Sequence, residues 1–210
     1  MEEIKDKISY GNELLRKGIH LTSVVIPILI YILEKELIVY ITLTAASLMI
    51  LFDLLRKVSS GFNKFYLMIL HPVLRSRELD VKKHLFTGGT YYVIGIFLTV
   101  WIFPKEIAAV AILIMILCDT AAALIGKKFG KHKILNKTLE GSLSFLIIGI
   151  IIIAVTPRIS QFPLEYLIAF IALILTTILE LLPLKIDDNL SIPIFFSLVY
   201  VLLNKIILNI

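Results

Sequence analysis

The sequence has 210 residues, of which 59% are hydrophobic and 18% are charged, and its formal net charge is +5. A soluble domain is about 45–50% apolar and about 25% charged, so this composition excludes an ordinary soluble protein and predicts an integral membrane protein. The single cysteine, Cys118, excludes an intrachain disulfide. We attribute the positive charge to lysine-rich loops at a membrane surface and expect no nucleic-acid partner.

Seven apolar segments are long enough to cross a bilayer as helices, which takes about 20 residues each. Charged or proline-containing stretches separate them, and no Gly/Ser-rich linker does, so we predict one membrane-embedded domain over residues 1–210 with an all-α fold. The first segment contains Pro27, which we expect to kink it. The seven segments are residues 18–34, 36–55, 85–103, 106–126, 139–156, 163–182 and 191–209.

Lysine and arginine are distributed unequally between the two sides of the membrane. The N-terminus and the loops after the second, fourth and sixth segments carry 17 of them, and the other side carries 4. The positive-inside rule therefore places the N-terminus in the cytoplasm and the C-terminus outside, at the plasma membrane if the source is prokaryotic. The unusual polar motifs fall on the cytoplasmic side, as an enzyme supplied from the cytosol requires. A transporter would distribute them along a path through the membrane.

The residues before the first segment form the first of these motifs. Over 13–20 we predict a helix in which Glu13, Lys17 and His20 share one face and Arg16 lies beside them. One interpretation is an ion pair between residues four apart that anchors the helix. The other is a site in which Arg16 and Lys17 contact phosphates and His20 binds phosphate or handles a proton.

The second segment ends in Asp53 and Arg56, which are one helical turn apart. A juxtamembrane salt bridge explains this pair as well as a functional site does. Small residues at 87–90 open the third segment, and they are typical of close helix packing, with direct substrate contact as the alternative.

The loop between the second and third segments contains an amphipathic pattern over residues 62–73. This stretch is too short and too flanked by charge to span a membrane. We therefore predict a helix in the membrane interface, either an anchor or a lid over an opening for lipids. Basic residues that follow are expected to meet anionic lipid headgroups. They are Arg75, Arg77, Lys82, Lys83 and His84.

The stretch 118–144 carries the most unusual chemistry of the chain. Asp119 interrupts an apolar segment, and a carboxylate inside a membrane helix costs roughly 2.5–3.5 kcal/mol on insertion scales. No residue of opposite charge lies within one turn of it on its own helix. We therefore favour a metal ion as its partner, with a lysine from elsewhere in the chain as the alternative.

A basic loop follows this carboxylate. Gly126 and Gly130 allow the backbone to approach a ligand closely, and five lysines in the loop suit a polyanion. Thr138 is a predicted N-cap, so the next helix would direct free amides of residues 138–142 into the same loop. We interpret the loop as a phosphate site; the alternative is a basic loop that only obeys the positive-inside rule. The five lysines are Lys127, Lys128, Lys131, Lys133 and Lys137.

Acidic residues gather near the start of the last segment. Glu180 lies near the end of the sixth segment, and Asp187, Asp188 and Asn189 precede the seventh. Three carboxylates near one membrane face suit Mg²⁺, which typically takes one or two carboxylates together with substrate phosphates. Asp188 or Asn189 could instead cap the last helix. The chain has no P-loop, no dinucleotide-binding fingerprint, no H-E-x-x-H motif and no Cys/His cluster.

Together these motifs resemble the CTP-dependent lipid-alcohol kinases, namely dolichol kinase, phytol kinase and the CTP-dependent diacylglycerol kinases, and more distantly the phosphatidate cytidylyltransferases. The family pattern D-x-x-A-x-x-x-G-x-x-x-G is matched by Asp119, Ala122, Gly126 and Gly130. Its K-K-T-x-E-G element is matched by Lys137, Thr138, Glu140 and Gly141, with Asn136 in place of the first lysine. Two further motifs agree, E-x-x-R-K-x-x-H from Glu13 to His20 and D-D-N-x-x-x-P from Asp187 to Pro193.

The resemblance implies a membrane kinase that transfers the γ-phosphate of CTP to an isoprenoid alcohol such as a polyprenol, with Mg²⁺ as cofactor and membrane lipids around it. A CTP-dependent diacylglycerol kinase, a cytidylyltransferase and a transporter are the alternatives, and the oligomeric state, a homo-oligomer included, stays open. The expected catalytic residues are Asp119, Glu140 and His20, and the expected metal ligands are Asp119, Glu180, Asp187 and Asp188. The expected nucleotide-binding residues are Arg16, Lys17, Gly126, Lys127, Gly130, Lys131, Lys137, Thr138, Gly141, Ser142 and Asn189.

Overall fold

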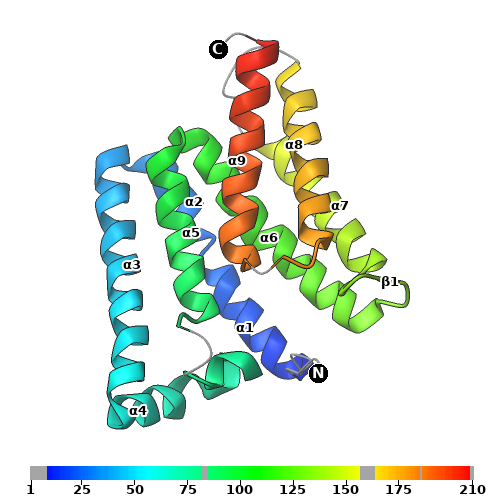
Figure 1. Ribbon diagram of the computed structural model, residues 1–210. Coiled ribbons are helices and arrows are strands. Elements are labelled where there is room, and N and C mark those ends of the chain that lie inside the picture. The colour runs from blue at the N-terminus through cyan, green and yellow to red at the C-terminus, as the bar shows by residue number, and fades with distance from the viewer. Residues whose placement is uncertain (1–8, 82–84, 157–163, 185, 209–210) are drawn as a thin grey trace.

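The computed structural model describes residues 9–81, 85–156, 164–184 and 186–208, and it is almost entirely helical (Figure 1). The predicted headgroup contacts of Lys82, Lys83 and His84 lie outside these residues. The helices are α1 (Tyr10–Thr22), α2 (Val25–Ile32), α3 (Lys35–Val58), α4 (Ser60–Leu70), α5 (Gly88–Ile102), α6 (Lys105–Phe129), α7 (Leu139–Val155), α8 (Leu164–Leu181) and α9 (Asp188–Ile207). Two 3₁₀ helices, η1 (His71–Val73) and η2 (Ser76–Leu79), and two strands, β1 (Lys133–Ile134) and β2 (Lys137–Thr138), accompany them.

The long apolar helices agree with the predicted membrane segments. Helices α1 and α2 taken together, α3, α6, α8 and α9 are each long and apolar enough to cross a membrane, and α5 and α7 are shorter apolar helices. Within the described residues this makes seven apolar units at the predicted positions. The beginning of α1 and the end of α9 lie at opposite ends of the molecule, as an odd number of crossings requires (Figure 1). The all-α, multi-pass prediction is confirmed, whereas the side that faces the cytoplasm stays a prediction.

The first membrane segment is broken rather than kinked. Helix α1 ends at Thr22 and α2 begins at Val25, two residues before Pro27. Proline has no N–H to donate, and its ring clashes with the carbonyl four residues earlier, so the helix cannot continue through this point. The backbone N–H groups of Ser23 and Val24 instead return to the carbonyls of His20 and Leu21. The break leaves α1 free to pack against α6 with its polar face.

Helix α6 forms the centre of the bundle. Two-thirds of its apolar window is buried (67%), against 17–44% in the other four long spans. It contacts α1, α2, α5, α7 and α9. Small side chains at Ala108, Ala109 and Ala111 are buried and allow these neighbours to approach closely. Any polar group near the end of α6 is therefore within reach of several helices.

Helices α5 and α9 meet at a very short distance. A Cβ atom on Gly95 of α5 would lie 2.3 Å from the carbonyl oxygen of Asn189, so only glycine fits at this contact. This contact fixes the beginning of α9 against α5. The acidic residues at the start of α9 are thereby held at a defined place beside the polar end of the bundle.

The segment between α3 and α5 begins with the predicted amphipathic helix. Residues 62–73 fall in α4 and η1, which confirms the helix. Tyr66 is buried, while Phe65, Met68 and Ile69 are exposed, so α4 has an outward apolar face suited to a membrane interface. Its location in that interface stays a prediction.

The basic loop contains a β-hairpin that the sequence analysis did not predict. Strands β1 and β2 are antiparallel, with Lys133 opposite Thr138 and Ile134 opposite Lys137. Leu135, in the two-residue turn, has a positive φ of 54°. Hairpin turns of this length usually contain Gly or Asn at such positions, and the leucine gave no such signal. The hairpin fixes the position of Lys137 relative to α7.

Candidate active site

A cavity of about 1020 Å³ lies where the polar ends of α1, α6, α7, α8 and α9 meet the hairpin and η2. Side chains from all four sequence motifs line it, although they are up to 175 residues apart in the chain. The charged side chains of the lining comprise six cations and six carboxylates. They are Glu13, Arg16, Arg75, Arg77, Glu78, Asp119, Lys127, Lys133, Lys137, Glu180, Asp187 and Asp188.

Asp119 lies on the cavity wall formed by α6, and a lysine from α1 is its partner. The ammonium group of Lys17 forms an ion pair with Asp119 Oδ2. The Lys17 side chain is 1% exposed and that of Asp119 is 13% exposed, so the carboxylate is the member of the pair that faces the cavity. The structure thus shows the remote lysine that the sequence analysis kept as an alternative. The pair also joins α1 to α6.

Of the two interpretations of this motif, the ion pair between residues four apart is not what the structure shows, because Lys17 turns toward α6. Glu13 instead pairs with Arg16, one turn further along α1, and its other oxygen lies 3.6 Å from Lys127 Nζ. Arg16 and Lys127 both line the cavity. Arg16 Nε is buried and has no hydrogen-bond partner among the described residues. This part of the wall therefore presents two cations, and the Nε–H group of Arg16 is available for a further hydrogen bond.

Lys137 lies between two of the predicted metal ligands. Its Nζ atom is 2.6 Å from Glu180 Oε1 and 2.9 Å from Asp188 Oδ2. Burial opposes the charge, but the carboxylates of Asp188 and Glu180 outweigh it and raise the pKa of Lys137 above its ordinary value. Ser142 adds a hydrogen bond from its hydroxyl to Glu180 Oε2 at 3.3 Å. Lys137 thus connects the hairpin with the end of α8 and the beginning of α9, and Ser142 of α7 joins them through Glu180.

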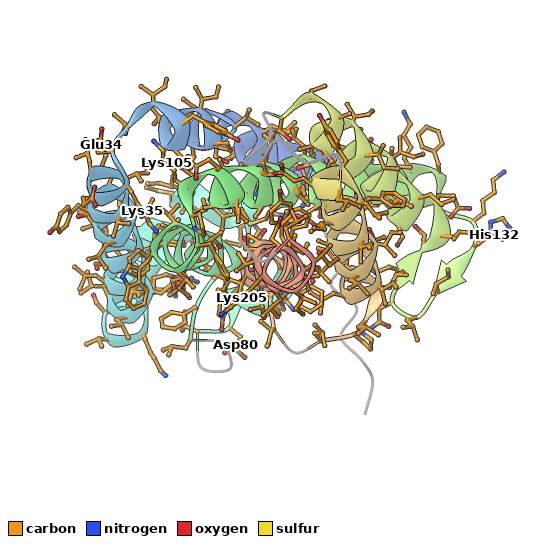
Figure 2. The ribbon with its side chains drawn as sticks, turned by 90° about the horizontal axis from the view of Figure 1, so that it is seen from above. Glu34, Lys35, Asp80, Lys105, His132 and Lys205 are labelled. Atoms are coloured by element: carbon orange, nitrogen blue, oxygen red, sulfur yellow. The ribbon has the colours of Figure 1, made fainter. Side chains whose placement is uncertain are left out.

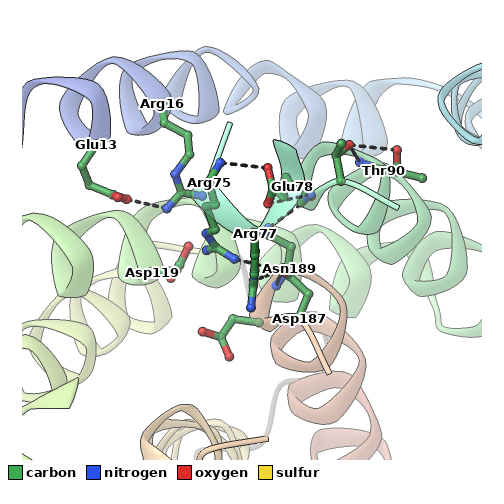
Figure 3. Close-up of polar contacts among 12 residues, drawn as sticks. Glu13, Arg16, Arg75, Arg77, Glu78, Thr90, Asp119, Asp187 and Asn189 are labelled. Atoms are coloured by element: carbon green, nitrogen blue, oxygen red, sulfur yellow. Dashed lines mark hydrogen bonds and ion pairs between the residues drawn. The ribbon is translucent and has the colours of Figure 1, made fainter. Parts of the chain in front are cut away.

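Asp187 caps α9, so the alternative in which Asp188 or Asn189 caps this helix is wrong. Its carboxylate accepts the backbone N–H of Asn189 at 3.1 Å. It also accepts hydrogen bonds from Arg75 Nη1 at 3.0 Å and from Arg77 Nη2 at 3.3 Å. Figure 3 shows these two arginines reaching toward Asp187. Asn189 is buried and donates from Nδ2 to the carbonyl of Gly88, so it holds α9 on α5 and does not line the cavity.

Thr138 caps α7 as predicted, with Oγ1 accepting the N–H of Gly141 at 3.2 Å. A Cβ atom on Gly126 would lie 2.7 Å from this Oγ1, and one on Gly141 would lie 2.9 Å from the carbonyl of Ala122. The two glycines are therefore required where α6 crosses the start of α7, and both line the cavity. The positive end of the α7 dipole is directed at the cavity from this crossing.

Four further predicted residues lie away from the cavity. Glu140 binds the backbone N–H of His132 at 3.2 Å and its Nδ1 at 2.8 Å, and so closes the hairpin from outside. Figure 2 shows His132 at the outer edge of the molecule. His20 packs against the ring of Tyr92, with 4.5 Å between the ring centroids. Gly130 and Lys131 are exposed at the base of the hairpin. None of these four is in the cavity lining.

The structure adds residues to the site that the sequence analysis did not assign to it. Arg75 and Arg77 had been predicted to contact lipid headgroups, but both line the cavity. Their partner Asp187 is more than 100 residues away, so no local pattern could indicate the contact.

Part of the wall is apolar, with side chains from the start of α5, the hairpin turn and the connection from α8 to α9. These are Phe86, Tyr91, Leu135, Leu182, Leu184 and Ile186.

The carboxylates of the cavity suit a metal ion that is coordinated partly by the protein and partly by a bound ligand. In the part of the chain that the structure describes, no group of three or more His, Cys, Asp or Glu side chains could hold a metal ion. Glu180 and Asp188 nevertheless converge on one ammonium group. Two carboxylates that converge on a cation fit Mg²⁺ when phosphate oxygens and water supply the other ligands.

No family model matches the chain. No solved structure matches it either. The chain is 35% identical over 101 residues to CTP-dependent diacylglycerol kinase 1 of Schizosaccharomyces pombe, and the matched region covers 47% of this chain and 44% of that protein. It is 30% identical over 131 residues to a dolichol kinase of the same yeast, covering 58% of this chain and 26% of the kinase. An uncharacterized protein of Rickettsia prowazekii is 27% identical over 185 residues, or 87% of this chain and 90% of that protein.

These relatives differ in how much of their length the chain matches. It spans less than half of either kinase, but nearly the whole of the rickettsial protein. The two kinases named here act on lipids, and the motifs of this chain had indicated the same family. The resemblance drawn from the motifs is confirmed: the chain is a homologue of the CTP-dependent lipid kinases.

Proposed function

We propose that this protein is a CTP-dependent lipid kinase that transfers the γ-phosphate of CTP to the hydroxyl of an isoprenoid alcohol at the cytoplasmic face of a membrane. The observation that carries the proposal is the composition of the cavity wall. Cations, carboxylates and apolar side chains converge there at one end of a membrane bundle. Such a wall suits a reaction between a metal-bound nucleotide and a lipid.

The cations of the wall would bind the phosphates. Phosphoryl transfer is catalysed mostly by positioning and by neutralising the charge of the phosphates. Arg16, Lys127, Lys133 and Lys137 approach the cavity from α1, α6 and the hairpin, so they surround a ligand instead of lying on one side of it. The amides at the start of α7 would add uncharged donors.

Glu180 and Asp188 would hold Mg²⁺ together with phosphate oxygens, and Asp119, the predicted metal ligand on α6, lines the same cavity. Each of the three carboxylates has a lysine as its present partner. The metal would neutralise part of the negative charge of the phosphates. When a metal nucleotide binds, Lys137 would pass from the carboxylates to the phosphates. The same residues would thus stabilise the empty and the occupied site by exchanging partners.

The apolar part of the wall would receive the lipid. Leu182, Leu184 and Ile186 are half-exposed side chains between α8 and α9, and Leu135 projects from the hairpin turn. They border the same cavity as the charged residues, so a lipid hydroxyl could reach the nucleotide while its chain remains in an apolar environment. Asp119 lines the cavity and His20 does not, so Asp119 is better placed than His20 to take the proton of the lipid hydroxyl.

Diacylglycerol is the second candidate acceptor, and the comparisons favour it specifically. CTP-dependent diacylglycerol kinases from three fungi match the chain at 29–35% identity, and the dolichol kinase matches at 30%. The apolar wall suits either lipid. A cytidylyltransferase would use the same nucleotide but attack the α-phosphate, and this difference can be measured directly.

The test uses the purified full-length chain in detergent with Mg²⁺ and CTP labelled at either the γ- or the α-phosphate. Separate reactions contain a polyprenol, a short prenol or diacylglycerol. Label transferred from the γ-position to a prenol supports the proposal, and γ-label on diacylglycerol alone supports the second candidate. Label from the α-position would identify a cytidylyltransferase. The absence of label with CTP and with the other nucleoside triphosphates would contradict an enzyme of either kind and favour a transporter.

A further inference from the structure

Arg75 reaches the cavity from a segment that no motif of the sequence included. It lies between η1 and η2, and its guanidinium group binds Asp187 at the start of α9 at 3.0 Å. Figure 3 shows it in the same region as Arg16, Arg77 and Asp119. Its side chain is 19% exposed, against 41% for Arg77. Burial opposes its charge, yet Asp187 and Glu78 raise the pKa of Arg75, so it stays a cation.

The backbone of Arg75 is held by Glu78. One carboxylate oxygen of Glu78 accepts the N–H of Arg75 at 3.1 Å, and the other accepts the N–H of Gly88 at 3.1 Å. Glu78 therefore ties the segment that carries Arg75 to the first residue of α5. Glu78 is itself buried. Burying a charged side chain is unfavourable unless hydrogen bonds compensate for the lost water, and the two backbone amides do so here.

A second layer of buried groups supports Glu78. Arg56 donates from Nη2 to the carbonyl of Glu78 at 3.0 Å and pairs with Asp53 at 3.3 Å. Its guanidinium lies over the ring of Tyr66, 4.3 Å from the centroid. Asp53 in turn accepts the N–H of Thr87 at 2.8 Å. The ends of α3, α4 and α5 are thereby joined to the segment that carries Arg75.

We propose that Arg75 is a phosphate-contacting residue of this site and that Glu78, supported by Arg56 and Asp53, is the residue that positions it. The inference rests on the proposed function for the identity of the nucleotide, but not for the presence of a polyphosphate site. An arginine presents a planar fork of donors that matches phosphate oxygens in pairs. A buried framework that fixes its backbone is expected where the direction of that fork matters.

The geometry favours a phosphate inside the cavity over a lipid headgroup outside it. Arg75 is more buried than Arg77, and it is directed at the start of α9. Arg16, whose Nε is buried without a partner among the described residues, belongs to the same wall. Each guanidinium group is now paired with one carboxylate, Arg16 with Glu13 and Arg75 with Asp187. A triphosphate inside the cavity supplies more negative charge for two such groups than one headgroup outside it.

The decisive experiment measures the binding of inorganic tripolyphosphate to the full-length protein in neutral nanodiscs, by calorimetry. Arg75→Gln should weaken binding about 10- to 100-fold, the range expected for hydrogen bonds to charged groups. Arg75→Lys keeps the charge but not the planar fork of donors, so its affinity should lie between those of the wild type and of Arg75→Gln. Lys64→Ala is the matched control, because Lys64 is an exposed cation on α4, in the same connection between α3 and α5, and is not in the cavity lining. It should bind like the wild type.

The result that overturns the inference is tripolyphosphate affinity in folded Arg75→Gln equal to that of the wild type. A wild type that binds no tripolyphosphate overturns it as well. A phosphate of a lipid headgroup is the other source of the same chemistry, so the titration is repeated in nanodiscs with anionic lipid. If the Arg75→Gln change alters only the dependence on anionic lipid, the headgroup contact replaces the inference. Binding by a wild type that shows no lipid phosphorylation would refute the proposed function and leave this inference standing.

The positioning role of Glu78 needs a separate measurement. Glu78→Gln keeps the size of the side chain but weakens the hold on the two backbone amides. We expect the KM for CTP to rise several-fold while kcat changes little, because the chemistry itself is untouched. Glu78→Asp, which restores the charge, should recover part of the affinity. A lower melting temperature with an unchanged KM would show a purely structural role and exclude positioning.

Discussion

Asp53 and Asp119 are both buried carboxylates on apolar helices, and their surroundings differ. The Asp53 side chain is 1% exposed and accepts hydrogen bonds from Arg56, from the backbone and hydroxyl of Thr87 and from Thr90. Asp119 is 13% exposed, pairs with Lys17 and lines the cavity. The first carboxylate is enclosed by several fixed donors, whereas the second has a single lysine as its partner and a face open to ligands.

This difference distinguishes a carboxylate that stabilises the fold from one that can bind a ligand. A carboxylate whose acceptor positions are filled by its own fold cannot take a new partner without breaking several bonds. A carboxylate paired with a lysine can exchange it for a metal or release it to a phosphate at lower cost, since both the old and the new contact are ionic. The comparison predicts that substitutions around Asp119 change activity and that substitutions around Asp53 change stability.

The largest effect on activity is expected at Asp119. Asp119→Asn keeps the shape of the side chain and an acceptor for Lys17, but it removes the charge that faces the cavity. Lipid phosphorylation should fall about 100-fold or more, as for other groups that stabilise a transition state electrostatically. The measurement is kcat with labelled CTP on protein that elutes as a monodisperse peak. Near-normal turnover would remove Asp119 from the chemistry and make it a second framework carboxylate.

The next effect is expected at Lys137. Lys137→Ala removes the ammonium group that Glu180 and Asp188 share, and leaves two carboxylates facing each other. We expect kcat/KM for CTP to fall about 10- to 100-fold, the range expected for a lost charge-assisted contact. The control is Lys64→Ala, which leaves every cavity residue in place. Equal losses in the two variants would mean that the basic loop acts only through its overall charge.

Substitution of Asp53 should lower the stability of the protein and leave its activity nearly unchanged. Asp53→Ala leaves Arg56, which is also buried, without its carboxylate, and breaking a buried pair destabilises proteins by about 3–5 kcal/mol. The melting temperature in detergent should therefore drop clearly. At a temperature where the variant remains folded, its kcat should stay within about threefold of the wild type, and an effect passed on through Glu78 to Arg75 should appear only in the KM for CTP. A loss of kcat as large as that of Asp119→Asn, with normal stability, would contradict the distinction between the two carboxylates.

The sequence was sufficient for features that depend on local pattern. Apolar runs located the membrane helices, and Thr138 was recognised as an N-cap from its place before an apolar run. Contacts between distant segments could not be derived in this way. Nothing near Asp119 indicated Lys17, 102 residues away, and nothing near Arg75 indicated Asp187, 112 residues away. Such pairs follow from how the helices pack, which depends on contacts such as that of Gly95 with Asn189.

The smallest effect is expected at Glu140, a member of the family pattern that the structure places outside the cavity. Its carboxylate holds His132, whose side chain is 73% exposed, so the contact is largely solvated and of modest strength. Glu140→Gln should keep one hydrogen bond to the hairpin, and kcat should change by about twofold or less, with a small rise in the KM for CTP as Lys137 becomes less fixed. Steady-state kinetics over a range of CTP concentrations separates the two parameters. A loss of kcat comparable to that of Asp119→Asn would restore the catalytic role that the motif suggested. It would also mean that the hairpin turns Glu140 toward the cavity when the nucleotide binds.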